Sequence, residues 1–336
     1  MKYLTATAPM VAAAALLGAP AFAHHSQSMF DTSKEIVIEG KVARFEWTNP
    51  HMYLVVDTKG PDGQPVQITG EGLAITQALV DGLKREDLKP GTAIVMRANP
   101  NRGGFGKQVR ILDVTTQDGE IHPFYEANHR TRTLTPADSI AGHWAPNRAA
   151  LGAAFGAMAR FPVTPEARAA QAQLLADGIC YAEPTPFIAI LDELRTIEVR
   201  KNEVIMRFDN SGDHVERVIR LAAQHAADVK PSRQGDAIGH WEGDTLVIDT
   251  IAFLPSPSGL AANVPSSAGK HTVERLSLTP DHTRLRYETT IEDPMYLSAS
   301  ATLTQQWDHR PDLEFSQDTG KCDPNVAAKY KQGLPN

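Results

Sequence analysis

The chain has 336 residues, of which 42% are hydrophobic and 22% are charged, and its 33 basic against 40 acidic residues give a net charge of −7. This is the composition of a globular protein, and the length suffices for two hydrophobic cores. A net negative chain without a basic stripe is a poor binder of nucleic acid or of an anionic membrane surface. Neither partner is therefore expected.

Residues 1–23 have the features of a secretory signal peptide. Lys2 supplies a positive end, a short apolar run spans Val11 to Leu17, and Ala21-Phe22-Ala23 fits an A-x-A cleavage site. The alternative is an N-terminal helix buried in the fold. Cleavage would begin the mature chain at His24 and place it in the periplasm or outside the cell. No later segment is long and apolar enough to predict integral membrane association.

Residues 24–122 are expected to form a small β domain. One short helical pattern begins near Leu73 and ends near Gly82. Strand-like runs are expected at 35–47, 51–58, 66–70, 89–100 and 107–123. Five short strands, with one helix between the third and the fourth, is the order of an OB-fold. The sequence therefore predicts an OB-like Greek-key barrel.

Residues 123–194 are expected to be a connecting segment with a helix after Thr164, a residue type suited to cap it. Residues 195–336 are rich in short β-branched runs separated by turn signals, a spacing that predicts an antiparallel β-barrel or sandwich. Gly142-His143-Trp144 resembles the G-x-W tripeptide that opens lipocalin barrels, and this likeness implies a lipocalin-like barrel. The fold class expected for the whole chain is mainly β.

The chain contains only two cysteines, Cys180 and Cys322. An oxidising compartment outside the cytoplasm would favour a disulfide bond between them. Such a bond would close a long loop, for which the chain-entropy model gives a stabilisation of about 4–5 kcal/mol. The alternative is two buried free thiols. No C-x-x-C spacing indicates a cysteine metal site.

Cleavage after Ala23 would give His24 an α-amine beside its imidazole, a pair that chelates one divalent metal. The α-amine has a pKa of about 8, so a metal displaces its proton at small cost at neutral pH. Amine and imidazole nitrogens rank Cu(II) highest among first-row divalent ions. His25 and His51 are the candidates to complete the set, and His51 follows Asn49-Pro50 at a turn made rigid by the proline. The expected ligands are therefore His24, His25 and His51, with copper favoured over Zn(II). Solvated or structural histidines are the other interpretation.

The stretch AHHSQSMFD, Gly40 and the segment WTNPH that ends at His51 resemble a secreted bacterial domain family. Its members begin His-His-Ser after the signal peptide, carry Phe-Asp soon afterwards and have Trp-x-Asn-Pro-His at the second strand. The likeness covers residues 24–117. The family is uncharacterised, so the resemblance implies no activity. It implies only that His24, His25 and His51 belong to a recurring pattern.

The second half offers candidate polar residues rather than a catalytic motif. The run GHWEGDTLVIDTIAF resembles segments of uncharacterised secreted bacterial proteins, and no reaction comes with that likeness. Asp249 lies within an apolar strand, where it either points into a barrel lumen beside an Arg or His partner or faces outward in a cross-strand pair. His271 has the residue type of a general base, and a surface position on its strand is the alternative.

Three functions are compatible with these patterns. The first is a copper-binding protein. The second is an enzyme that acts on a small, largely apolar molecule in the C-terminal barrel, with His271 and Asp249 as catalytic candidates. The third is a carrier that uses the same barrel. Ionisable side chains that converge in the lumen would favour the enzyme, and a wholly apolar lumen would favour the carrier. The Gly/Ser/Pro-rich run 254–269 predicts a flap over the barrel.

Overall fold

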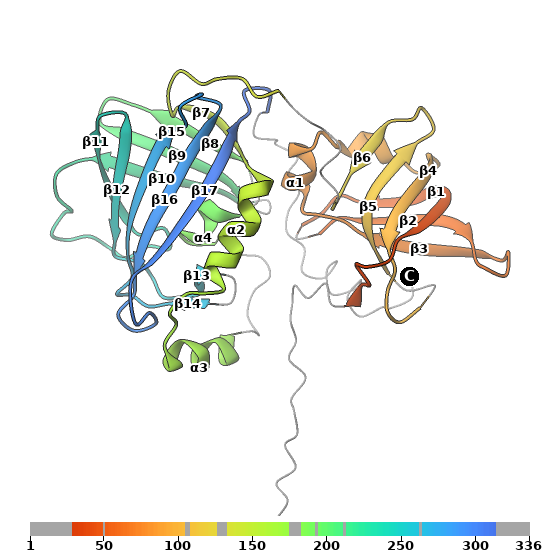
Figure 1. Ribbon diagram of the computed structural model, residues 1–336, viewed down its shortest axis with the longest axis horizontal. Helices are drawn as coiled ribbons and strands as arrows, with labels where there is room; N and C mark the ends of the chain where they lie inside the picture. The colour runs from red at the N-terminus through yellow and green to blue at the C-terminus, as the bar shows by residue number, and fades with distance from the viewer. Residues whose placement is uncertain are drawn as a thin grey trace, which may run out of the picture.

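The computed structural model describes residues 29–49, 51–104, 108–125, 133–174, 183–191, 194–210, 213–261 and 264–313. Figure 1 shows two β-barrels side by side, with helix α1 (Ile75–Val80) on the flank of the N-terminal barrel that faces the other. The fold is mainly β, as predicted, and a few short helices accompany the strands.

The N-terminal barrel has the strand order β3-β2-β1-β4-β5-β6, and an additional parallel pairing of β3 with β5 closes it. Helix α1 and the 3₁₀ helix η2 (Arg85–Leu88) lie between β3 and β4. This is the strand and helix order predicted for an OB-like barrel. The strands are β1 (Ile36–Glu46), β2 (Tyr53–Lys59), β3 (Pro65–Glu71), β4 (Ala93–Asn99), β5 (Val109–Thr116) and β6 (Ile121–Pro123).

Alternating residues of these strands build one core. Ile38 and Val42 of β1 point inward with Leu54 and Val56 of β2, and all four are buried. Gly40 lies between the two inward residues of β1, where a Cβ atom would stand 2.3 Å from the carbonyl oxygen of Asp57. Only glycine allows β1 and β2 to approach this closely, which explains the break in the apolar pattern of the sequence.

In the described part of the second half, nine strands close into a barrel in the order β10-β11-β12-β15-β16-β17-β7-β8-β9. Neighbouring strands are antiparallel except β10 and β11, which are parallel. The strands are β7 (Gly142–Pro146), β8 (Arg195–Val199), β9 (Glu203–Asn210), β10 (Asp213–Leu221), β11 (Asp236–Glu242), β12 (Thr245–Ile251), β15 (His271–Leu278), β16 (Arg284–Glu292) and β17 (Ala301–His309).

Strand β7 carries the Gly-His-Trp tripeptide and pairs with both β17 and β8. The barrel thus includes a strand from within residues 123–194, the stretch that the sequence assigns to a connecting segment. Trp144 of this strand is fully buried, and its indole nitrogen donates to the carbonyl of Ile140 at 2.9 Å. The tripeptide therefore contributes to the barrel core.

The rest of the connecting segment is partly helical, as expected. Helix α3 (Pro165–Leu174) follows Thr164, whose hydroxyl accepts from the backbone N–H of Ala167 at 3.2 Å, so the predicted cap is present. Helix α2 (Arg148–Met158) packs along β17, as Figure 1 shows, and α4 (Phe187–Ile190) is fully buried. The run 254–269, expected as a flap, contains a hairpin of β13 (Ser256–Ala261) and β14 (Val264–Ser266) that contacts α3 and α4.

A small apolar contact joins the two barrels. Val80 of α1 packs with Ala145 of β7 and Leu194, and Leu313 lies against them. The Arg310 guanidinium also donates to the carbonyl of Val80 at 3.2 Å. Within the residues that the structure describes, no helix is long and apolar enough to cross a membrane. Cys180 and Cys322 both lie outside the described residues, so the disulfide bond stays a prediction.

Candidate functional site

The turn between β1 and β2 carries His51. The preceding Asn49 is fully buried, and its side-chain oxygen accepts from the backbone N–H of Ile75, the first residue of α1, at 3.1 Å. This bond fastens Asn49, just after the end of β1, to the start of the helix. The backbone that carries His51 is therefore fixed on a rigid part of the barrel rather than on a free loop.

Contacts at Nδ1 set the protonation of the His51 ring. Nδ1 lies 2.9 Å from the carbonyl oxygen of Gly72, which can only accept, so Nδ1 must carry the proton. The hydroxyl of Tyr125 donates to the same carbonyl at 3.1 Å and lies 3.4 Å from Nδ1, while a carboxylate oxygen of Glu71 is 3.6 Å from Nδ1. In the neutral ring, this tautomer places the lone pair on Nε2. A carbonyl or carboxylate behind one ring nitrogen is the usual support of a metal-ligating histidine.

The residues behind His51 form a polar group at one rim of the barrel. Gln108 donates to Glu71 at 2.7 Å, and the guanidinium of Arg110 lies 3.8 Å from the centre of the Tyr125 ring. Burial lowers the pKa of Arg110, and the nearby Tyr125 and Glu71 act in the opposite direction. These contacts hold the Glu71 and Tyr125 side chains in place, and therefore the groups that orient the imidazole.

The other two predicted metal ligands, His24 and His25, lie outside the described residues. Among the described residues, no three His, Cys, Asp or Glu side chains come together as a metal site. His51 with Glu71 alone is therefore an incomplete ligand set, and any metal at this corner needs further donors from elsewhere in the chain.

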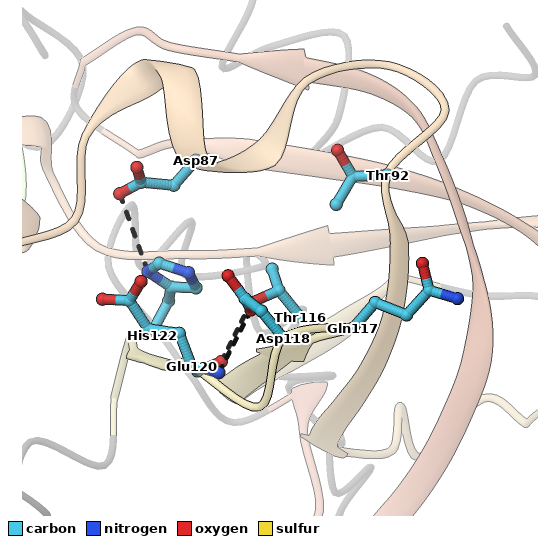
Figure 2. Close-up of a pocket in the computed structure, with 7 residues that line it drawn as sticks. All are labelled: Asp87, Thr92, Thr116, Gln117, Asp118, Glu120 and His122. Atoms are coloured by element: carbon cyan, nitrogen blue, oxygen red, sulfur yellow. Dashed lines mark hydrogen bonds and ion pairs between the residues drawn. The ribbon is translucent and has the colours of Figure 1, made fainter.

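A cavity of about 270 Å³ lies at another place on the same barrel (Figure 2). Asp87 of η2 points toward the ring of His122, with 3.7 Å between its carboxylate and Nδ1. Hydrogen bonds from the Thr116 hydroxyl and the Glu120 backbone hold the pKa of Asp118 below its usual range. The carboxylates give this pocket a negative potential, and none of the site residues predicted from the sequence lines it.

Asp249 and His271, the candidates of the C-terminal barrel, are brought together. Their side chains are 39% and 34% exposed, and His271 Nε2 lies 2.9 Å from a carboxylate oxygen of Asp249. Both lie on the outer wall, because the inward positions of β12 and β15 are occupied by buried residues such as Thr250 and Glu274. Of the two orientations open for Asp249, the structure shows the outward cross-strand pair. Burial opposes protonation of His271, but the hydrogen bonds to Asp249 and Glu292 outweigh it and raise the ring's pKa.

The lumen of this barrel contains a different set of ionisable groups. Arg217 of β10 reaches across to Glu274 of β15 and donates to both its carboxylate oxygens, one of them at 2.9 Å. The hydroxyl of Tyr287 donates to Glu274 at 2.8 Å, and Arg217 also donates to the hydroxyl of Thr250 at 2.7 Å. These four side chains bond one another inside the barrel, and Arg217 Nε has no hydrogen-bond partner within the described residues. Burial and the adjacent Glu274 carboxylate raise the pKa of Tyr287 well above its usual value.

A buried lysine, Lys270, directly precedes β15. Lys270 donates to the carbonyls of Thr185 and Gly259 at 2.6 and 3.0 Å, and its ammonium lies 4.0 Å from the centre of the Phe253 ring. Burial lowers the pKa of Lys270 to about 7. Lys270 thus ties β13 and the chain just before α4 to the start of β15. The nearby Ser267 hydroxyl donates to a carboxylate oxygen of Asp293 at 2.8 Å.

Sequence reasoning missed Arg217, Glu274 and His225. Arg217 is in phase with the inward Val215 and Ile219, and Glu274 is in phase with Leu276. A charge in the apolar phase of a strand is a recognisable signal of a buried pair. His225 lies in an irregular loop, bonded to Asp249 at 2.8 Å, and no periodicity in the sequence marks it.

Comparison with protein-family models finds a match to the N-terminal part of the chain. Residues 12–110 match a family described as a family of unknown function, DUF6152. The match covers less than a third of the chain and includes His24, His25, His51 and Glu71. No curated protein matches the chain. The N-terminal part of the chain is thus similar to a family of unknown function, and this similarity supplies no activity.

Proposed function

We propose that this chain is an exported copper-binding protein whose metal is held at the rim of the N-terminal barrel. In this proposal, residues 1–23 are removed, His24 provides its α-amine and imidazole, and His51 provides Nε2. His25 is the further nitrogen donor. These nitrogen ligands favour Cu(II) over other first-row divalent ions, and the mature protein works in the periplasm or outside the cell.

One observation carries the proposal: the His51 ring is oriented from behind, by the Gly72 carbonyl at 2.9 Å from Nδ1. A histidine that merely ended a turn would have no need of this support, nor of Glu71 and Tyr125 beside the same nitrogen. The family match adds support because it spans both the end of the proposed leader and His51. Copper bound here would supply redox or carrier chemistry, and the barrel residues orient the imidazole.

Cu(II) titration of the mature, untagged chain tests this proposal. We expect the chain that begins at His24 to bind one Cu(II) with a nitrogen-rich spin-resonance spectrum. An alanine added before His24 should weaken binding, because it moves the α-amine out of reach of the chelate. His51→Gln should weaken it too, whereas His240→Gln, at an exposed histidine of β11, should not. An unchanged affinity after the added alanine would rule out the α-amine as a ligand. An intact mass showing that the exported protein still contains residues 1–23 would contradict the premise that His24 is the N-terminal residue.

A second function is supported by a different observation, the outer-wall pair of His271 and Asp249 at 2.9 Å. We propose as the alternative an enzyme or carrier for a small apolar molecule at the C-terminal barrel, with Asp249 orienting His271 as a base. The carrier version needs a wholly apolar lumen, and the mutual bonds of Arg217, Glu274 and Tyr287 inside the barrel count against it. Saturable binding of the uncharged dye N-phenyl-1-naphthylamine would support a site for an apolar molecule on this barrel, and its absence would count against both versions.

A further inference from the structure

His225 lies in the loop between β10 and β11, and both of its ring nitrogens contact carboxylates. Nδ1 is 2.6 Å from Asp236 of β11, and Nε2 is 2.8 Å from Asp249 of β12. An ionised carboxylate only accepts hydrogen bonds, so each ring nitrogen must donate a proton to make both bonds. The geometry therefore requires the doubly protonated, positively charged ring, and the side chain is only 16% exposed.

Further charged groups extend this contact into a row across the outer barrel wall. Arg220 of β10 donates to both oxygens of Asp236 at 2.8 and 2.6 Å. His271 of β15 bonds the second oxygen of Asp249 and lies 3.5 Å from Glu292 of β16. Burial alone would raise the pKa values of Asp236 and Asp249, but the hydrogen bonds from His225 and its neighbours outweigh burial and lower both. The two carboxylates that face His225 are thus kept ionised.

His225 is the main attachment of residues 222–231. In the described part of the chain, these residues make no hydrogen bond to the barrel other than those of His225. The loop's own charged residues, Asp228 and Lys230, are exposed and form no described ion pair with it. The next attachment is Ser232, whose backbone pairs with Ala252 and Leu254 at 3.0 and 2.8 Å. Loss of the His225 bonds would therefore free residues 222–231 while leaving residues 232–235 in place.

We propose that His225 is a proton-operated latch that fastens residues 222–231 to the barrel wall beside the Asp249–His271 pair. A neutral imidazole donates from one nitrogen only, and its other nitrogen then turns a lone pair toward a carboxylate oxygen. One of the two bonds is replaced by repulsion, and the loop is released. The loop is closed in acid and open in alkali, and opening uncovers Asp249, which sits under His225 and next to His271.

Limited proteolysis of the full mature chain with proteinase K tests the latch. After correction for the rate at which the protease cleaves a free peptide of residues 222–231 at each pH, these residues should be at least about tenfold more protected from cleavage at about pH 5.5 than at about pH 8.5. His225→Gln should lower protection at the acidic pH and abolish the difference. His240→Gln, on the neighbouring strand, should keep it.

Two outcomes would overturn the latch. One is equal protection of residues 222–231 at both pH values in the parent chain. The other is a pH dependence that survives in His225→Gln, since another group would then control the loop. Near-ultraviolet circular dichroism establishes that the variant is folded. If it is not, Asp236→Ala provides the same test, because it removes one of the two acceptors and should lower protection at the acidic pH.

Discussion

The ion pair between Arg217 and Glu274 should behave as one unit in the stability of the C-terminal barrel. The two residues are 3% and 0% exposed, so neither charge has access to bulk water. Glu274→Leu leaves the guanidinium buried without its counter-charge, which costs about 3–5 kcal/mol. Tyr287 loses its acceptor at the same time, and an unsatisfied buried hydroxyl costs about 1–3 kcal/mol. We expect the free energy of unfolding to fall by about 4 kcal/mol or more. The double variant Arg217→Met/Glu274→Leu removes both charges and should lose only the cost of the unsatisfied Tyr287 hydroxyl, about 1–3 kcal/mol.

Urea unfolding followed by tryptophan fluorescence measures this difference. Trp144 and Trp307 are fully buried in the same barrel, and the Trp307 ring stacks on Tyr287 with 5.2 Å between ring centres, so their emission reports the loss of this core. Glu288→Leu, which breaks an exposed pair with Arg286 on the same barrel, is the matched control and should cost about 1 kcal/mol or less. A loss below about 1 kcal/mol in Glu274→Leu, or a double variant as unstable as the single one, would show that the charges are not buried as a pair.

Three further predictions follow from the electrostatics. Burial without a counter-charge raises the pKa of Asp209 to about 7, so the folded state loses stability as the pH rises above the pKa that this carboxyl has in the unfolded chain. Asp209→Asn should therefore raise the melting temperature at pH 8 and leave it unchanged at pH 4. Equal changes of the melting temperature at both pH values would contradict this. Since hydrogen bonding to Asp249 helps raise the pKa of His271, Asp249→Asn should lower that pKa in an NMR titration. An unchanged pKa of His271 in this variant would show that Asp249 does not raise it. Glu71→Gln should weaken Cu(II) binding by about 10-fold to 100-fold, whereas Gln67→Glu, on the exposed part of β3, should leave it unchanged. Equal Cu(II) affinities in the parent and both variants would exclude Glu71 from the site.

Local patterns predicted the strands better than they predicted the site. The alternation in β1, the helix between β3 and β4 and the Thr164 cap follow from periodicity and capping, which are properties of neighbouring residues. Barrel closure, by contrast, depends on pairings between segments that are distant in the sequence. Gly70 of β3 pairs with Val109 of β5 in the N-terminal barrel, and β7 pairs with β17 in the second barrel. The outward position of Asp249 was one of two orientations that strand parity left open. No rule of spacing could choose between them, because the direction of a strand face depends on the whole barrel.

The same limit applies to the contacts that orient His51. Gly72 and Tyr125 are 21 and 74 positions away from His51 in the sequence, and neither residue type indicates a metal site. The tautomer of His51 is therefore a property of the folded barrel. In the sequence only the Asn49-Pro50-His51 turn was visible, and the structure adds the reason why its ring has a fixed direction.

The two barrels use their polar residues in opposite ways, and this bears on which of them binds a ligand. In the C-terminal lumen, Arg217 and Glu274 bond each other and cross the space that an enclosed apolar molecule would need. Entry of such a molecule would separate these charges or leave them unsolvated, at a cost of several kcal/mol. At the rim of the N-terminal barrel, Gly72 and Glu71 both lie at the Nδ1 side of the His51 ring and orient it. The mutually neutralised charges inside the C-terminal barrel favour stability over binding. The oriented His51 ring favours binding of an external ligand, so we expect the function of the chain at the rim of the N-terminal barrel.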